Sequence, residues 1–526
     1  MVPPTVANCQ TPQDILRRQA ERLGDKPFLF CGDQELSFVD LDRLSDQIAA
    51  GLQQRGIEKH DFVAVMMGNS ADFVTTWLAI AKCGAVFVPI NTEQRGMVLR
   101  HILEYSRCRL IVAEASLLER VEAELSSLSR PVDVVVRARN DEVQGRPSLI
   151  SLQQCSAKLG AVSVSRLDPG VIMFTSGTTG PSKGSLKPHH EAIYIADFVT
   201  QTVGYTPEDR LYLTLPLFHG NAHGLGLVPA MMAGASVVLE EKFSASKFWS
   251  QVRRYGCTVA NYVGSVISIL AKAAPLPDDG DNPLRVMWGS GAPASLFEEF
   301  EQRFKVSLIE GYGMTEIGIL LLNLPGNHYS GTCGVVRDDY EVKLVNDAGE
   351  HCAVGETGEL LVRPRVPNVM MLEYVGMPEK TVEAWRDLWF HTGDYLAQEP
   401  DGSFRFVDRK KDAIRRRGEN VSSYEVEAAV SLYAPVLECA AVGVPSELGE
   451  EEILVCLVLR PGASFSEQEF LSHCRNHMAS FMVPRYVRLM ERLPKTATQR
   501  VEKYRLRSEG KAAGTHDLFP LFNRKN

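Results

Sequence analysis

The sequence predicts an α/β protein with a large N-terminal domain and a smaller α+β domain at the C-terminal end. Up to about residue 330, short apolar runs of strand length alternate with longer segments whose apolar residues recur at helical spacing. Beyond that point, strands separated by turns become more frequent. The chain has 526 residues, which is more than one domain usually holds, so we expect more than one domain.

The N-terminal part repeats the order helix, glycine, strand. Residues 36–57 place apolar side chains at helical spacing and end near Gly56, and residues 61–68 form an apolar run that stops at a glycine. Residues 70–90 repeat this order. Further apolar runs of strand length are 108–114 and 130–138. Such alternation is typical of βαβ units, so we expect largely parallel sheets covered by helices.

The N-terminal domain is predicted to end in a small β-subdomain, which the C-terminal domain follows. Residues 340–364 alternate apolar and polar side chains around "DAG", which indicates a hairpin. After a dense charge run, "SSYEVEAAVSLY" combines an N-cap serine with a helical pattern. The next two apolar runs, "VLECAAVGVP" and "ILVCLVLRPG", predict strands. We therefore expect domains at residues 1–408 and 409–526.

Composition excludes several classes of protein. Hydrophobic residues make up 45% and charged residues 23% of the chain, which is ordinary for a globular enzyme. The formal net charge is −9, which argues against a nucleic-acid binder, because such a protein needs a basic surface. The 11 cysteines are scattered without a CxxC pair, which indicates reduced thiols in a cytoplasmic protein. The opening residues lack the apolar core of a signal peptide. Residues 224–239 are too short for a membrane span and contain Pro229, so we expect a buried helix-to-strand passage.

A glycine-rich loop is the strongest local signal. The apolar strand 171–174 runs directly into "TSGTTGPSKG". Glycines let the backbone curl so that its N–H groups point at phosphate oxygens, while the hydroxyls and the lysine add donors. The loop lacks the GxxxxGK[ST] spacing of a conventional NTPase, so by itself it predicts only a phosphate site. The candidate residues are Thr175, Ser176, Gly177, Thr178, Thr179, Gly180 and Lys183.

Further motifs resemble one enzyme superfamily over nearly the whole chain. "EGYGMTEIG" (310–318), "FHTGDYL" (390–396) and "DRKKDAIRRRGENVSSYEVE" (408–427) follow the glycine-rich loop in the order found in the adenylate-forming superfamily. That superfamily holds acyl-CoA synthetases, carrier-protein adenylation domains and luciferases. "LPLFHGNA" (215–222) and the 408–427 segment look most like the crotonobetaine/carnitine-CoA ligase branch.

The resemblance implies a reaction in two halves. A carboxylic acid attacks the α-phosphate of ATP, with Mg²⁺, to give acyl-AMP and pyrophosphate, and the thiol of CoA then displaces AMP. It also implies that the C-terminal domain is mobile and rotates between the two halves. A homodimer is common among members of the superfamily, but the sequence leaves the oligomeric state open.

The resemblance also implies the nucleotide site. Thr175 to Lys183 would hold the phosphates, Asp394 would accept both ribose hydroxyls, and Arg409 would reach the ribose or phosphate. Glu316 would bind Mg²⁺, because a hard cation prefers carboxylate oxygen. The expected residues around the adenine and phosphate are Gly289, Ser290, Gly291, Ala292, Tyr312, Gly313 and Thr315.

Other implied positions concern CoA, the hinge and the acid. Lys411 would lie at the hinge, and most other side chains of the 409–417 charge run would face solvent. His219 and His223 have zinc-like spacing, but the glutamate of HExxH is missing. His219 would instead gate the acyl pocket, and His223 would be a pocket or core residue. The residues expected near CoA are Gly418, Glu419 and Asn420, and those expected near the acid are His219, Asn221, His223, Gly264, Gly289 and Gly318.

Small residues gather at these expected pocket positions. Two explanations stay open: they leave room for a bulky acid, or the glycines serve backbone geometry.

One position departs from the superfamily pattern. The segment P-K-T-x-x-G-K ends there in the lysine that acts in adenylation, whereas here it reads "PKTATQR", with Gln499 and Arg500 in the last two places. Arginine keeps the charge but spreads it over a planar fork, unlike the compact ammonium. Either Arg500 or the nearby Lys503 substitutes for the lysine, or adenylation is weak and acyl-AMP comes from a separate enzyme.

Three other functions also remain open from the sequence. The chain would be a full ATP-dependent synthetase of a bulky acid, an enzyme that loads a carrier protein, or a catalytically dead nucleotide- or acyl-binding protein. The motifs that surround Glu316, Asp394 and Arg409 argue against the last of these.

Overall fold

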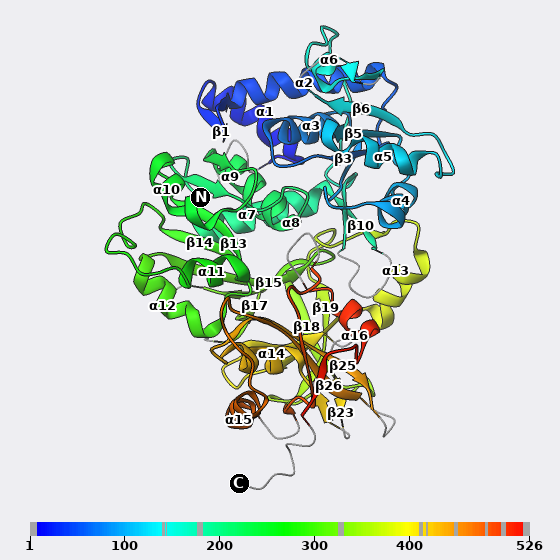
Figure 1. Ribbon diagram of the computed structural model, residues 1–526. Helices are drawn as coiled ribbons and strands as arrows, with labels where there is room; N and C mark the ends of the chain where they lie inside the picture. Colours follow the sequence, from blue (N-terminus) through cyan, green and yellow to red (C-terminus); the bar gives the residue numbers. More distant parts are fainter. Residues whose placement is uncertain are drawn as a thin grey trace. The chain divides into compact units, whose positions relative to one another are not determined.

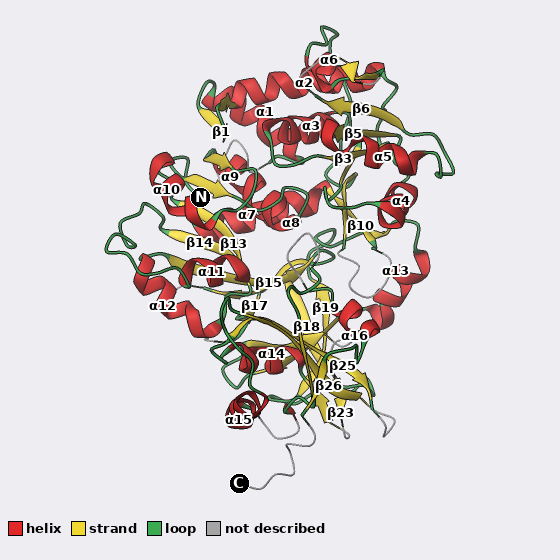
Figure 2. Cartoon of the chain, viewed as in Figure 1, coloured by secondary structure: helices red, strands yellow, loops and turns green. Residues whose placement is uncertain are grey.

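The computed structural model describes residues 8–138, 142–143, 145–175, 182–324, 331–409, 414–416, 419–446, 451–478, 482–495 and 501–518 (Figures 1 and 2). These residues form two compact units. The first contains the described residues up to Glu341 together with Arg363–Trp385, and the second contains Val342–Val362 and the described residues from Arg386 onward.

A nine-stranded sheet forms one half of the first unit. Its strands, in spatial order, are β17 (Val335–Val336), β16 (Gly318–Asn323), β15 (Ser307–Met314), β14 (Val286–Ser290), β13 (Val259–Val263), β11 (Arg210–Leu213), β12 (Ser236–Leu239), β1 (Pro27–Cys31) and β2 (Gln34–Ser37). The strands from β15 to β1 are parallel, and antiparallel strands close both edges.

A seven-stranded sheet forms the other half. Its order is β20 (Glu373–Tyr374), β10 (Gly184–Pro188), β9 (Pro169–Phe174), β4 (Val86–Pro89), β3 (Phe62–Met66), β5 (Leu110–Glu114) and β6 (Asp133–Arg137). The strands from β9 to β6 are parallel, and β10 returns antiparallel to β9 after the glycine-rich loop. A short hairpin, β7 (Glu142–Val143) with β8 (Arg146–Pro147), lies outside this sheet.

Helices surround these sheets, as the ribbon views show (Figures 1 and 2). They are α1 (Pro12–Leu23), α2 (Phe38–Gln54), α3 (Ala71–Lys82), α4 (Gly96–Ser106), α5 (Leu118–Leu125), α6 (Leu149–Gln153), α7 (His189–Val203), α8 (Gly220–Ala222), α9 (Val228–Ala233), α10 (Ala245–Tyr255), α11 (Gly264–Ala271), α12 (Ala294–Phe304) and α13 (Pro378–Ala384), with the 3₁₀ turn η1 (Ala115–Leu117) and the π turn η2 (His223–Leu227). Helix α3 is apolar almost all round and buried, and it contacts α1 and α2. The core of the unit therefore lies around α3 and the parallel strands β3 and β4.

The second unit contains two four-stranded sheets. One has the order β18 (Tyr340–Val345), β19 (Thr357–Pro364), β21 (Phe390–Gln398) and β22 (Phe404–Arg409), and the other has β25 (Val436–Pro445), β26 (Glu451–Leu459), β27 (Tyr486–Leu489) and β28 (Thr515–Asp517). The remaining elements are η3 (Arg386–Leu388), β23 (Ile414–Arg416), β24 (Glu419–Val421), α14 (Ser423–Ser431), α15 (Glu467–His477) and α16 (Lys503–Glu509). Helices α14 and α16 pack on β25.

The predicted α/β class is confirmed, and most predicted elements occur. Residues 36–57 begin as strand β2 before α2 starts at Phe38, because Ser37 accepts from the backbone N–H of Asp40 and caps the helix. The run 224–239 is a buried turn, helix α9 and strand β12, as expected. No helix among the described residues is long and apolar enough to cross a membrane. The domain limits 1–408 and 409–526 concern a mobile domain and stay a prediction.

Leu388 provides a test of backbone strain. Its φ is 64°, in the left-handed region, and its side chain is 81% exposed. A residue with a side chain is destabilised by about 1–2 kcal/mol in that region. Replacement by glycine removes this strain, but the extra backbone entropy that glycine loses on folding offsets about 0.5–1 kcal/mol of the gain. Leu388→Gly should therefore raise the free energy of unfolding by about 0.5–1 kcal/mol, measured by urea denaturation.

Leu432→Gly is the matched control for this substitution. Leu432 is 60% exposed and has a right-handed φ of −77°, so its replacement by glycine should destabilise the protein. Equal losses in the two variants would contradict the assignment of strain to Leu388.

Candidate active site

Hydrogen bonds join the two described ends of the glycine-rich loop. Residues 176–181 lie outside the described residues, so the predictions for Ser176, Gly177, Thr178, Thr179 and Gly180 cannot be placed. Thr175 N donates to the carbonyl of Lys183 over 2.9 Å, and Lys183 N donates to Thr175 Oγ1 over 3.3 Å. The hydroxyl of Ser182 also donates to the carbonyl of Thr175. Thr175 and Lys183 are therefore held opposite each other where β9 ends and β10 begins.

Lys183 lies on an aromatic ring from another part of the first unit. Its Nζ is 4.1 Å from the centroid of Tyr374, which belongs to β20. Burial lowers the pKa of Lys183, and the carboxylates of Glu316 and Glu383 oppose that shift. The ring face is electron-rich and attracts the ammonium where water is largely excluded.

Tyr374 also contacts the predicted metal ligand. Its hydroxyl donates to Glu316 Oε1 over 2.7 Å, and Glu316 is 3% exposed. Among the described residues, the second carboxylate oxygen of Glu316 has no hydrogen-bond partner, and no group of three or more His, Cys, Asp or Glu side chains could hold a metal. A single carboxylate suits Mg²⁺, which commonly takes its other ligands from phosphates and water.

Close backbone contacts explain several of the glycines. A Cβ at Gly264 would lie 1.9 Å from the carbonyl oxygen of Gly291, and one at Gly289 would lie 2.2 Å from that of Tyr262. At Gly313 it would lie 1.9 Å from the carbonyl oxygen of Gly318. These distances are far below any van der Waals contact, so only glycine fits. Backbone geometry therefore accounts for these glycines, and they carry no information about the size of the acid.

The expected adenine wall is tied to a carboxyl group on the neighbouring strand. Glu310 on β15 accepts from the backbone N–H of Gly291 over 2.7 Å. Burial raises the pKa of Glu310 to about 7, although the N–H groups of Gly291 and Ala292 oppose that shift. Tyr312, which is half-buried, follows on the same strand, and Thr315 follows on the turn. The predicted adenine and phosphate residues thus lie on neighbouring segments at the ends of β14 and β15.

The two histidines have different surroundings. His219 is half-buried and immediately precedes α8, whereas His223 is 5% exposed and lies edge-on to Trp77 with ring centroids 4.3 Å apart. Burial lowers the pKa of His223 to about 3, so it stays neutral. Of the two possibilities left open for it, the structure favours a core histidine. Asn221 donates to the carbonyl of Tyr262 over 3.2 Å and accepts from Asn261 over 2.8 Å.

In the second unit, Asp394 and Arg409 face each other on β21 and β22. Arg409 Nε is 3.5 Å from Asp394 Oδ1, and Asp394 is 4% exposed. The backbone N–H of Asp394 donates to Thr392 Oγ1 over 3.1 Å, which fixes the turn that presents the carboxylate. Both predicted ribose-binding residues are therefore brought together.

Lys503 lies in a separate network of the second unit. Its Nζ is 2.8 Å from Glu427 Oε1 and donates to Ser423 Oγ over 2.5 Å. Burial raises the pKa of Glu427, and the charge of Lys503 opposes that shift. Asp408 accepts from the backbone N–H of Ser423, so the network joins α16, α14 and the end of β22. Glu419 and Asn420 form part of β24, whereas Lys411, Gly418 and Arg500 lie outside the described residues.

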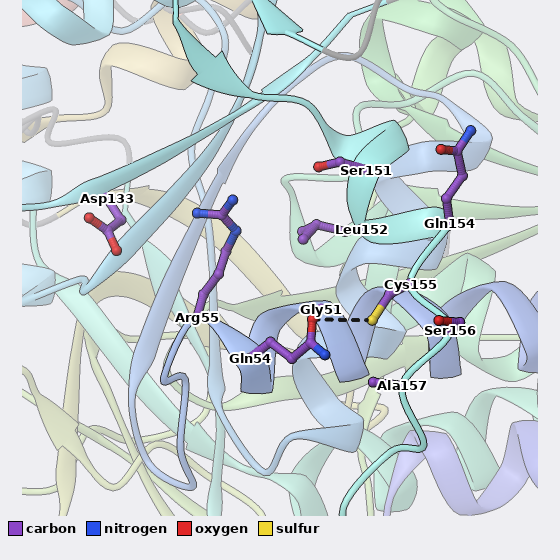
Figure 3. Close-up of a pocket in the computed structure, with 10 residues that line it drawn as sticks. All are labelled: Gly51, Gln54, Arg55, Asp133, Ser151, Leu152, Gln154, Cys155, Ser156 and Ala157. Atoms are coloured by element: carbon purple, nitrogen blue, oxygen red, sulfur yellow. Dashed lines mark hydrogen bonds between the residues drawn. The ribbon is translucent and has the colours of Figure 1, made fainter.

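A polar cavity elsewhere in the first unit holds none of the predicted residues (Figure 3). Its volume is about 640 Å³, and it lies at the end of α2 and beside α6. Within it, Cys155 Sγ donates to Gln54 Oε1 over 3.6 Å. No predicted chemistry is assigned to this cavity.

Comparison with known families decides which enzymes this chain belongs with. A model of AMP-binding enzymes matches residues 16–374, and a model of the AMP-binding enzyme C-terminal domain matches residues 425–500. The chain belongs to the AMP-binding enzyme family. The crotonobetaine/carnitine–CoA ligase of Salmonella paratyphi A is 31% identical over 503 residues, covering 93% of this chain and 97% of that protein. The ligase of Salmonella typhi is 31% identical over 483 residues, covering 90% and 93%.

Solved structures agree with this assignment. The anthranilate CoA ligase AuaEII in complex with anthranoyl-AMP is 27% identical, with a TM-score of 0.88 over 96% of this chain and 98% of that one. A benzoate CoA ligase from Burkholderia xenovorans LB400 shares the fold, with 23% identity and a TM-score of 0.85 over 94% and 99%. The expected resemblance is confirmed, and the chain is an acyl-CoA ligase of the adenylate-forming superfamily.

Glu310 makes stability depend on pH in a defined direction. Its carboxyl has a pKa of about 7 when folded against an ordinary value of 4.5, so the folded state holds a proton that the unfolded chain releases. The stabilisation of the folded state by protonated Glu310 is complete below pH 4.5 and is lost as the pH rises through about 7. In the wild-type protein this carboxyl should lower the free energy of unfolding by about 2 kcal/mol between pH 5 and 8. Glu310→Gln should remove that decline, as measured by urea denaturation at each pH.

Glu301→Gln is the control for this prediction. Glu301 also accepts a backbone N–H, that of Leu308 over 2.7 Å, but its replacement leaves Glu310 in place. This variant should keep the wild-type decline. A decline that persists in Glu310→Gln would show that another group causes it.

Proposed function

We propose that this protein forms acyl-CoA thioesters from acyl-adenylates, and that its own adenylation step is weak or silent. In the thioester step the CoA sulfur attacks the acyl carbonyl carbon, the bond from that carbon to the phosphate oxygen breaks, and AMP leaves as the thiol proton is released. The acyl-AMP would then come from a separate adenylating enzyme.

The contacts of Lys503 are the main support for this proposal. Of the two basic residues that could replace the adenylation lysine, Lys503 is bonded to Glu427 and Ser423 and is 17% exposed. Glu427 Oε1 also accepts from the backbone N–H of Ala441 over 2.7 Å. Drawing Lys503 away would leave the half-buried carboxylate of Glu427 without its counter-charge, which is costly. Lys503 is therefore a poor replacement, and the task falls on Arg500.

Arginine is a poor equivalent at such a position. The adenylation lysine acts as a compact positive charge between the acid and the α-phosphate, and the guanidinium is broader and planar. Removing one positioned donor from a transition state costs about 10²–10³ in rate. The thioester step uses the region around Gly418, Glu419 and Asn420 and does not need this charge, so the loss would be selective.

Each unit, taken by itself, holds residues of the kind that a nucleotide needs. Lys183 would bind the phosphates with Thr175, Asp394 and Arg409 would bind the ribose, and Glu316 would bind Mg²⁺. These contacts also suit a full ATP-dependent synthetase, which is therefore the second candidate. His219 and Asn221 would border the acid, and a homodimer is the proposed assembly.

The first experiment compares two reactions of the purified protein by mass spectrometry. One contains ATP, Mg²⁺, CoA and a panel of acids that includes crotonobetaine, carnitine, anthranilate, benzoate and bulkier acids. The other contains the matching acyl-adenylates with CoA alone. We expect acyl-CoA mainly from the adenylates. Efficient formation from ATP and an acid would overturn the proposal and establish a full synthetase, and no acyl-CoA from any adenylate would indicate a binding protein.

Arg500→Lys tests the cause of the weak adenylation. Restoring a compact ammonium should raise pyrophosphate release by about 10²–10³-fold with an acid that the protein accepts as adenylate. Arg505→Lys is the matched control, because Arg505 lies on α16 and pairs with Glu502 over 3.2 Å. It should leave pyrophosphate release unchanged. If Arg500→Lys releases pyrophosphate at the wild-type rate, Arg500 is not the cause of the weak adenylation.

A further inference from the structure

Tyr374 contacts two oppositely charged groups, the half-buried Lys183 and the buried Glu316, through different parts of one side chain. The hydroxyl donates to Glu316 Oε1 over 2.7 Å, and Lys183 Nζ lies 4.1 Å from the ring centroid, over the face. Tyr374 is 2% exposed, so the side chain is fixed by packing. Burial and the nearby Glu316 raise the pKa of the phenol far above its usual value, so it remains a hydrogen-bond donor.

The backbone around Tyr374 is bonded to both charged segments. On one side, Leu372 N donates to the carbonyl of Leu186 over 2.7 Å and Val375 N donates to that of Gly184 over 2.9 Å, both on the strand that follows Lys183. On the other side, Met371 N donates to the carbonyl of Glu316 over 2.8 Å.

A fourth bond fixes the same segment. The backbone N–H of Tyr374 donates to Thr381 Oγ1 over 3.0 Å. Five residues, 371–375, thus connect the strand after Lys183 to the turn that carries Glu316. Such a segment sets the relative positions of the two side chains before any ligand arrives.

We propose that Tyr374 is a positioning residue that keeps Lys183 and Glu316 apart and correctly oriented for a nucleoside triphosphate and its Mg²⁺. A half-buried lysine and a buried glutamate attract each other, and a direct salt bridge would occupy both. The ring offers the ammonium a weaker partner, and the hydroxyl occupies only one oxygen of the carboxylate. Lys183 stays available to phosphate oxygens and Glu316 Oε2 to the cation. This inference rests on the proposed function, because it takes those two groups as the ATP- and Mg²⁺-binding residues.

The hydroxyl and the ring can be tested separately. Tyr374→Phe removes the bond to Glu316 and keeps the ring under Lys183, whereas Tyr374→Leu removes both. Tyr340→Phe is the matched control, since the buried hydroxyl of Tyr340 donates to the carbonyl of Ile317 over 3.0 Å, next to Glu316. Melting temperatures and circular dichroism identify variants that fold.

The first readout is the gain in ATP affinity on adding Mg²⁺, from calorimetric titrations of the full-length protein with Mg²⁺ and with EDTA. Loss of a group that orients a metal ligand typically weakens metal binding by about 10–100-fold. We expect the Mg²⁺ gain to fall by about tenfold or more in Tyr374→Phe and to stay at the wild-type value in Tyr340→Phe. An unchanged gain in Tyr374→Phe, or a wild-type protein that gains nothing from Mg²⁺, would overturn the inference.

The second readout is the rate at which an amine-directed acylating reagent labels Lys183 at one fixed pH, measured by mass spectrometry. If the ring keeps the two charges apart, Tyr374→Leu should let Lys183 pair with Glu316 and should slow labelling several-fold. Tyr374→Phe should retain the wild-type rate. Equal rates in all three proteins would contradict the separating role of the ring. Neither readout requires adenylation, so these outcomes do not depend on whether the protein releases pyrophosphate from ATP.

Discussion

The candidate site depends on the carboxyl ends of three parallel strands lying in register. Tyr262 pairs with Gly289 between β13 and β14, and Gly289 pairs with Glu310 between β14 and β15. The segments that leave these strands approach so closely that Gly264 and Gly289 leave no space for a Cβ. This packing places the 289–292 segment beside Glu310 on β15, so residues distant in sequence become neighbours.

Burial gives the charged groups of the first unit their properties. Lys183 and Glu310 are half-buried and Glu316 is buried, and each has a specific neighbour: an aromatic face, backbone N–H groups or a phenol hydroxyl. In such surroundings an unsatisfied charge is expensive and a direct ion pair is strong. In the proposed role of Tyr374, this arrangement would leave the ammonium and the carboxylate available to a ligand, as an active site requires.

The second unit shows the opposite use of a buried charge. Lys503 is fully engaged by Glu427 and Ser423, and with Asp408 this network ties α16 to α14 and β22. A lysine so held ties α16 to α14, and under the proposed function it takes no part in adenylation. The contrast between Lys183 on a ring face and Lys503 in an ion pair is the physical basis for assigning catalysis to one and structure to the other.

The sequence by itself determined the fold class, most strands and helices, and the superfamily, because these depend on periodicity, capping and motifs that are local in the chain. It also placed Asp394 and Arg409 in one site, and the two strands put them opposite each other. Tertiary structure alone revealed Tyr374, since nothing between residues 316 and 374 indicates that this phenol reaches Glu316 while its ring supports Lys183. It also decided that Gly264 and Gly289 serve backbone contacts and that Lys503 is engaged, because contact distance and burial arise only when distant segments pack.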